Sequence, residues 1–237
     1  MKLHLNSTAN LGDFLNALPV LSGIYKSTSE KIYLIIRKEM RKFKGLKELL
    51  MYQDIFEDVV FEDEVFVSGV KILSSWARED KNNENRPIET CRYENWLKDN
   101  YNMKFDVDDD FILQVPELEM KFDDEYYCGD RWSGPDIDTR RKSNTLANIG
   151  NVRYLDYNDD IIENAYIIKN CKPPFISTFT GISGIADLLN KDQVVLWSNE
   201  LKNWDGKPIE YSFEKHYYGN RKSTLMYIDD FSVEALA

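Results

Sequence analysis

The sequence predicts an α/β fold built from two Rossmann-like halves with a cleft between them, and three observations support this prediction. The chain opens with alternating apolar residues at Lys2 to Asn6, which lead through a polar loop into an amphipathic stretch from Asp13 onward. A nearly continuous apolar run at Lys31 to Ile36 is typical of a central parallel strand. The same alternation resumes after Pro116. Strands that alternate with helices in this way indicate parallel sheets with right-handed crossovers.

The first half of the chain reads β-α-β-α-β. In its first helical segment Pro19 interrupts the apolar pattern, and we expect it to kink the helix or to delay the start until about Ala17. A second amphipathic pattern runs from Met40 to Leu50 and predicts another helix. Short strands are expected at Val59–Phe61 and at Val65–Val67.

The middle of the chain combines a polar loop, a helix and an acidic segment. Residues Arg78 to Pro87 are polar and helix-breaking, and a helix is expected over Ile88–Tyr101. The carboxylates between Asp106 and Asp110 lack the glycine and the terminal glutamate of a calcium-binding loop, so we expect a solvated linker and no metal site. The domain boundary is predicted after residue 118, giving domains 1–118 and 119–237.

The second half repeats the alternation of strands and helices. Strands are expected at Glu125–Cys128, Val152–Leu155, Phe175–Thr178, Gln193–Trp197 and Leu225–Ile228. Helices are expected at Thr139–Ile149, Ile161–Ile168 and Gly181–Asn190.

Composition narrows the class of protein. The chain has 30 basic and 41 acidic residues, a net charge of −11, which argues against indiscriminate binding to nucleic acid. Arg37 to Lys47 nevertheless forms a local basic cluster, which is either a solvated helix face or a contact surface for phosphate. No signal peptide and no apolar run of membrane-spanning length are present, which predicts a cytoplasmic protein. The three cysteines, Cys91, Cys128 and Cys171, are expected to be reduced and buried.

Several enzyme classes are disfavoured by missing motifs. The sequence has no Gly-x-Ser-x-Gly elbow, no phosphate-binding Gly-Lys-Ser and no Gly-x-Gly-x-x-Gly fingerprint, which argues against a hydrolase, an NTPase and a dehydrogenase. His4 and His216 are the only histidines and lie far apart in the sequence, so a zinc site is not expected.

Two segments resemble a known family. Leu11-Gly-Asp-Phe-Leu-Asn-Ala-Leu-Pro19 resembles the opening motif of the heptosyltransferase-type glycosyltransferases (glycosyltransferase family 9), which have the two-domain GT-B fold. The segment from Phe175 to Leu189, with the following strand Val194–Trp197, is similar to the donor-binding segment of that family. Phe179 and Gly184 stand where the family has Asp and His, which suggests a donor other than ADP-heptose.

The chemistry of sugar transfer assigns roles to these residues. A base must remove the proton of the acceptor hydroxyl, and the resemblance implies Asp13, which is otherwise an ordinary first-turn carboxylate. Amides and cations must stabilise the departing diphosphate. The donor-binding residues are expected to be Thr180, Gly181, Ser183, Gly184, Arg131, Arg140 and Lys142. The acceptor-binding residues are expected to be Asn10, Gly12 and Arg41. Gly181 and Gly184 have an alternative explanation in close packing between elements.

The sequence therefore predicts a metal-independent glycosyltransferase, with residues 1–118 on the acceptor side and residues 119–237 binding the donor. It needs no cofactor beyond its nucleotide-sugar co-substrate. Its acceptor is either a surface glycan or a hydroxymethylated pyrimidine of phage DNA, and a phage enzyme would act in the host cytoplasm. The alternative is a non-catalytic protein that binds a nucleotide or a nucleotide sugar.

Overall fold

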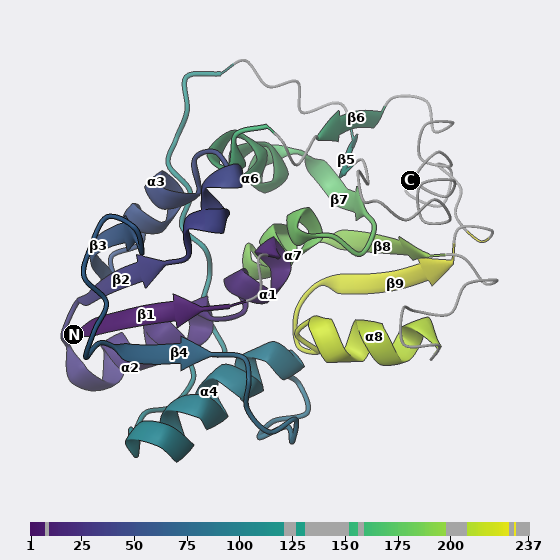
Figure 1. The fold of residues 1–237 in the computed structure, drawn as a ribbon. Helices are drawn as coiled ribbons and strands as arrows, with labels where there is room; N and C mark the ends of the chain where they lie inside the picture. The colour runs from purple at the N-terminus through teal and green to yellow at the C-terminus, as the bar shows by residue number, and fades with distance from the viewer. Residues whose placement is uncertain are drawn as a thin grey trace.

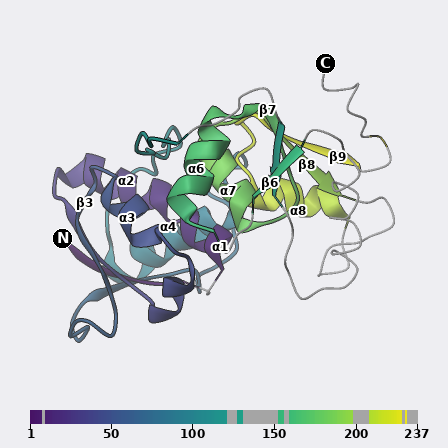
Figure 2. The same ribbon diagram turned by 90° about the horizontal axis from the view of Figure 1, so that it is seen from above.

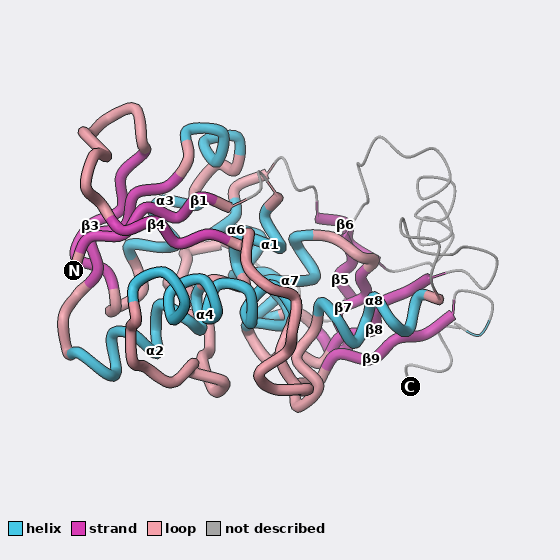
Figure 3. Tube along the Cα trace, turned by 60° about the horizontal axis from the view of Figure 1, so that its bottom comes forward, coloured by secondary structure: helices cyan, strands magenta, loops and turns pink. Residues whose placement is uncertain are grey.

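Two parallel β-sheets form the framework of the protein, as the sequence predicts. The computed structural model describes residues 1–7, 10–120, 127–130, 152–155, 159–197, 208–227 and 230. One sheet has four strands in the order β3-β2-β1-β4, and the other has five in the order β6-β5-β7-β8-β9. Figure 3 shows the two sheets as separate groups of strands with helices around them. The fold is therefore α/β with two Rossmann-like halves.

The elements follow one another in the predicted alternation. The first half contains β1 (Lys2–Asn6), α1 (Leu11–Leu15), α2 (Leu18–Thr28), β2 (Ile32–Ile36), the 3-10 helix η1 (Lys38–Lys42), α3 (Leu46–Met51), β3 (Phe56–Phe61), β4 (Lys71–Ser74) and α4 (Ile88–Tyr101). The second half contains β5 (Tyr127–Asp130), β6 (Val152–Leu155), α6 (Ile161–Asn170), β7 (Lys172–Ser177), α7 (Gly181–Leu188), β8 (Gln193–Trp197), α8 (Ile209–His216) and β9 (Ser223–Tyr227).

Strand β1 occupies the centre of the first sheet. Leu3 lies opposite Leu34 of β2 on one side and opposite Lys71 of β4 on the other, with both neighbours parallel. Leu3 and Leu5 are fully buried, whereas His4 between them is half-buried. This alternation follows from the period of two along a strand, and it directs the leucines into the core.

The first half follows the sequence-based prediction at Pro19 and differs from it in two other places. Pro19 lies in the first turn of α2, where its missing N–H costs no hydrogen bond, and the helix starts just after Ala17, as predicted. The segment Met40–Leu50 is divided at Gly45, whose φ of 79° ends the helical geometry. Val65–Val67 forms no strand. The strand β4 lies further along at Lys71–Ser74, and its half-exposed edge position weakens its apolar signal.

The acidic segment is not the solvated linker that the sequence predicts. Asp108 is buried, accepts a hydrogen bond from Ser22 Oγ at 2.6 Å and pairs with Lys26 Nζ at 2.7 Å. The chain beyond it continues in an extended form with Phe111 buried, and its alternate residues Leu113 and Val115 are buried as well. Burial of these side chains fixes the connection between the two halves. Within the described residues, no cluster of three or more His, Cys, Asp or Glu could hold a metal.

The second half follows the prediction in its described part. Strands β6 and β8 have the expected bounds, and β5, β7 and β9 overlap the expected segments but begin two or three residues away from them. The helix expected at Thr139–Ile149 falls outside the described residues. Helix α8 was not predicted. Its Phe213, with Tyr217 just beyond its end, packs in an aromatic cluster with Phe179 and Trp197. Aromatic residues on several sides of this segment obscure its helical period.

One hydrophobic core runs through both halves. It joins Leu11 and Leu15 of α1 to Ile182 and Ile185 of α7, among many other buried side chains. Figures 1 and 2 show α1 beside α7, between the two sheets. Cys91 and Cys171 are buried free thiols, as expected, and the side chain of Cys128 lies outside the described part. None of the described helices has the length and apolar character needed to cross a bilayer. The boundary after residue 118 stays a prediction.

Candidate functional site

The contact between α1 and α7 brings the two predicted site segments together. Both helices follow the carboxyl end of a parallel strand, β1 and β7, which is where ligands bind in open α/β sheets. A β-carbon placed on Gly12 would lie 3.8 Å from the Cα of Gly181. The first turn of α1, which carries Asp13, therefore lies next to the first turn of α7 (Figure 1). Sequence reasoning placed these segments in different halves, and the fold makes them neighbours.

Helix α4 fixes the chain around Asp13 through Tyr93. The Tyr93 hydroxyl, whose side chain is fully buried, donates to the backbone carbonyl oxygen of Asp13 at 3.1 Å. The side chains of Ser7, beyond β1, and Ser75, beyond β4, hydrogen-bond to the same tyrosine. Burial raises the pKa of Tyr93 above its usual range. The phenol therefore stays protonated and continues to donate its hydrogen bond to the backbone oxygen of Asp13. Tyr93 thus connects the first turn of α1 with the residues that follow the carboxyl ends of β1 and β4.

A second carboxyl lies close to Asp13. Glu89, in the first turn of α4, is 6% exposed, and its Oε1 accepts a hydrogen bond from Arg92 Nη1 at 2.6 Å. Burial, together with a smaller effect of the negative charge of Asp13, raises the pKa of Glu89 to about 7, and Arg92 opposes the rise. Arg92 also pairs with the exposed Glu79. Perturbed carboxyls of this kind concentrate at functional sites.

The turn that opens α7 is held by its own side chains. The Thr180 hydroxyl accepts from the Ser183 amide at 3.2 Å, and the Ser183 hydroxyl donates to the Thr180 carbonyl oxygen at 2.7 Å. Ser183 is fully buried and its hydroxyl lies 2.5 Å from that of Tyr217. Thr180 and Gly181 are half-buried. The structure gives Ser183 a capping role, and its contact with a donor stays a prediction.

Phe179 packs where the resembled family has an acidic residue. Its ring meets those of Trp197 and Tyr217 edge to face, with centroids 5.5 and 5.4 Å apart. Phe179 is buried, so it serves the packing between α7, β8 and the end of α8. The α7 turn therefore carries no carboxylate at this position.

Of the basic residues predicted for the site, Arg41 is engaged with carboxylates. Arg41 places Nη1 2.6 Å from a carboxylate oxygen of Asp63 and Nη2 2.7 Å from one of Glu64. Arg37 pairs with Glu39 and also donates to the carbonyl oxygen of Ser7 at 3.1 Å, so it helps to fix the loop after β1. Asn10, the N-cap of α1, is exposed and makes no side-chain capping bond. The donor-side cations Arg131, Arg140 and Lys142 lie outside the described residues.

Comparison with solved structures identifies the fold. Neither a protein-family model nor a curated protein sequence matches the chain. The E. coli ADP-heptose LPS heptosyltransferase II has a TM-score of 0.58 at 10% identity, over 100% of this chain and 96% of that one. The E. coli heptosyltransferase WaaC with ADP has 0.56 at 10% identity, over 100% and 98%. A family 9 glycosyltransferase from Veillonella parvula has 0.56 at 8% identity, over 95% and 85%. The chain has the fold of these GT-B glycosyltransferases.

This likeness confirms the fold that the sequence motifs suggest. At such low identity it concerns the arrangement of helices and strands, and the roles of Asp13 and of the α7 turn stay predictions. Sequence reasoning missed three residues of α4: Tyr93, which donates to the backbone oxygen of Asp13, and Glu89 with its partner Arg92. Their signal was weak because Glu89 and Arg92 resemble an ordinary exposed pair on a helix. Only the fold shows that the first turn of α4 faces α1.

The two glycines of α7 give a matched test of the α1–α7 contact. A β-carbon on Gly181 would lie 2.7 Å from Leu11 Cβ, whereas one on Gly184 would meet nothing closer than 3.8 Å. We expect Gly181→Ala to lower the free energy of unfolding by about 1–3 kcal/mol through overpacking. We expect Gly184→Ala to raise it by about 0.5–1 kcal/mol, because alanine is the better residue inside a helix. Urea unfolding of both variants measures the difference, and equal effects would show that α1 and α7 do not pack this closely.

Proposed function

We propose that the protein is a glycosyltransferase that moves a sugar from a nucleotide-sugar donor to a hydroxyl acceptor without a metal ion. The observation that carries this proposal is the contact between the first turns of α1 and α7 (Figures 1 and 2). It places a carboxylate, Asp13, beside a helix N-terminus that follows a parallel strand. One is suited to accept a proton and the other to face a phosphate, and sugar transfer requires both.

Asp13 is proposed as the base that removes the acceptor proton. It lies in the first turn of α1 and is half-buried. The bond from Tyr93 to its backbone oxygen fixes the turn that carries it. A positioned base can act only if its geometry is maintained, and the buried phenol supplies that support. The acceptor would approach from the side of Asn10 and Gly12, which open the same helix.

The donor diphosphate is proposed to bind at the first turn of α7. The first amides of a helix have no partner within the helix, and its dipole favours negative charge at this end. Thr180 and Gly181 remain half-buried, although the Ser183 amide already donates to Thr180. Arg131, Arg140 and Lys142 are proposed to add positive charge as the diphosphate departs.

A glycan is the better proposal for the acceptor than duplex DNA. Binding to DNA would depend on lysine and arginine side chains that are available to neutralise phosphates. Three of the six basic residues between Arg37 and Lys47 lie close to carboxylates: Arg41 is paired with two, Arg37 contacts Glu39, and Lys44 lies 3.7 Å from Asp160. With a net charge of −11, the chain as a whole repels a polyanion. A neutral sugar hydroxyl meets no such penalty.

A thermal-shift panel of UDP-, GDP-, ADP-, CMP- and dTDP-sugars tests the proposal. A ligand at 100 times its dissociation constant stabilises the folded state by about 2.7 kcal/mol. For a chain of this size each kcal/mol raises the melting temperature by about 2–4 °C. We therefore expect one nucleotide class to raise the melting temperature by roughly 5–10 °C, and that donor to be consumed when a glycan acceptor is added.

A variant carrying Arg131→Gln, Arg140→Gln and Lys142→Gln serves as the control, and it should lose most of this shift. A donor that binds tightly but is never consumed would favour the alternative, a non-catalytic nucleotide-sugar-binding protein. If no nucleotide sugar changes the melting temperature, both proposals are wrong.

A further inference from the structure

Helix α4 covers the outer edge of strand β4. This strand is the last of the first sheet, so its side away from β1 has no neighbouring strand (Figure 1). Ile72 of β4 has both of its backbone polar groups bonded to side chains of α4. Its N–H donates to the Tyr101 hydroxyl at 2.9 Å, and its carbonyl oxygen accepts from Trp96 Nε1 at 2.8 Å. A phenol and an indole thus occupy the positions that a further strand would use.

The surroundings of Trp96 and Tyr101 hold these two side chains in place. Tyr93 and Leu97 of the same helix are fully buried, which fixes α4 against the sheet. Trp96 and Tyr101 are half-buried at the margin of the core, and Lys71 Nζ lies 5.8 Å from the centroid of the Tyr101 ring. Any two rings of suitable size would fill this space. Packing alone therefore does not explain why one ring offers an acceptor and the other a donor to the same residue.

The opposite edge of the same sheet is closed in a different way. On β3 the Val59 amide donates to Asp58 Oδ1 at 2.8 Å, and the Phe61 amide donates to Glu64 Oε2 at 3.0 Å. Carboxylates thus satisfy these amides and also place negative charge along the strand. Charged side chains on an edge oppose its pairing with another copy of the same edge.

Strand β4 has weaker protection of this kind. Its sequence, Lys-Ile-Leu-Ser, contains one charged residue, Lys71, and the Ile72 side chain is 37% exposed. An exposed apolar strand edge is a template for pairing with another chain. The hydrogen bonds from α4 are therefore the main protection of this edge.

We propose that Trp96 and Tyr101 block the open edge of β4 and so prevent it from pairing with β4 of a second copy of the chain. This inference is independent of the proposed activity. Two copies related by a twofold axis can place their β4 strands antiparallel, so that the two Ile72 residues exchange both backbone hydrogen bonds. In the wild type these groups are already bonded to the phenol and the indole. Pairing would break as many hydrogen bonds as it forms.

The double variant Trp96→Phe, Tyr101→Phe tests the proposal, because it keeps two aromatic rings and removes both hydrogen bonds to Ile72. The freed N–H and carbonyl groups should then pair between copies. We expect self-association at concentrations roughly 10–100-fold lower than in the wild type, the ratio for two recovered hydrogen bonds. Sedimentation equilibrium over a range of protein concentrations measures the change. Association equal to that of the wild type would mean that the two rings serve packing only, and would overturn the proposal.

Tyr227→Phe is the matched control. Tyr227 belongs to β9, the edge strand of the second sheet, and its hydroxyl bonds to the carboxylate of Glu210. This variant also loses a tyrosine hydroxyl at a sheet edge, but the lost bond is to a side chain. Its self-association should match that of the wild type. If Tyr227→Phe associates as strongly as the double variant, the effect does not come from β4 and the proposal is wrong.

Amide hydrogen exchange locates the contact. In a dilute sample of Tyr101→Phe, which loses a single hydroxyl, the Ile72 amide should exchange faster than in the wild type because its acceptor is gone. In a concentrated sample of the double variant the same amide should become protected again as β4 pairs. An Ile72 amide that exchanges at the wild-type rate in Tyr101→Phe would contradict the proposal. So would association of the double variant that leaves this amide unprotected, since the contact would then lie elsewhere.

Discussion

Replacing Asp13 by asparagine is expected to lower the turnover number by roughly 10²–10⁴-fold, the usual contribution of a general base. Asparagine has nearly the same size and can still hydrogen-bond, but it cannot accept the acceptor's proton. The support from Tyr93 goes to the backbone oxygen of residue 13, so the turn should keep its place in the variant. Donor affinity, measured by the shift in melting temperature, should change little. Steady-state kinetics at saturating donor and acceptor measure the effect.

Glu163→Gln separates catalysis from helix electrostatics. Glu163 is the acidic residue in the first turn of α6, as Asp13 is in the first turn of α1. Both variants lose a carboxylate that favours the helix dipole, a change worth about 0.3–1 kcal/mol in stability. Turnover should fall only in Asp13→Asn. Near wild-type turnover in that variant would mean that Asp13 is a first-turn carboxylate and not the base.

The fold could be predicted from the sequence because most helices and strands have a clear periodic pattern of apolar residues. Lys2–Asn6, Ile88–Tyr101 and Gln193–Trp197 have in the structure the bounds that their patterns predict. The failures occur where the pattern does not determine the structure. An edge strand such as Lys71–Ser74 is half-exposed, and the extended segment near Asp108 is buried by contacts with α2 that lie more than 80 residues away in the sequence.

The candidate site was accessible only in part. Asp13 and Thr180 could be named because they follow strands, at positions where parallel sheets present their ligands. Glu89 and Tyr93 could not, because their roles depend on how the first turn of α4 packs against α1. No local pattern encodes that contact. The residues that follow strands could therefore be predicted from the sequence, whereas the residues that support them from another helix could be found only in the structure.

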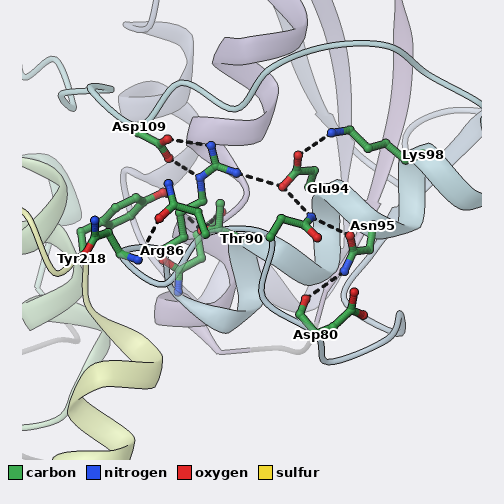
Figure 4. Close-up of polar contacts among 12 residues, drawn as sticks. Asp80, Arg86, Thr90, Glu94, Asn95, Lys98, Asp109 and Tyr218 are labelled. Atoms are coloured by element: carbon green, nitrogen blue, oxygen red, sulfur yellow. Dashed lines mark hydrogen bonds and ion pairs between the residues drawn. The ribbon is translucent and has the colours of Figure 1, made fainter.

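Replacing Arg86 by methionine is expected to lower the free energy of unfolding by about 3–5 kcal/mol, as found when one partner of a buried ion pair is removed. Arg86 is 12% exposed; its guanidinium contacts Asp109 and lies 3.0 Å from Glu94, whose side chain is 4% exposed (Figure 4). Methionine fills similar volume but leaves both carboxylates without their shared cation. Domains of ordinary stability have only about 5–15 kcal/mol in total. Urea unfolding followed by circular dichroism measures the loss.

Arg78→Met is the control for this change, because it alters the same residue type in the same loop. Arg78 also faces two carboxylates, Asp80 at 3.2 Å and Asp99 at 3.4 Å, but its side chain is 55% exposed. Water already screens this interaction, so the free energy of unfolding should fall by no more than about 1 kcal/mol. Both arginines face two carboxylates, and the main difference between them is burial. Equal decreases in the free energy of unfolding would mean that the carboxylates of Asp109 and Glu94 reach solvent. The connection between the two halves would then be stabilised by its buried apolar side chains and not by Arg86.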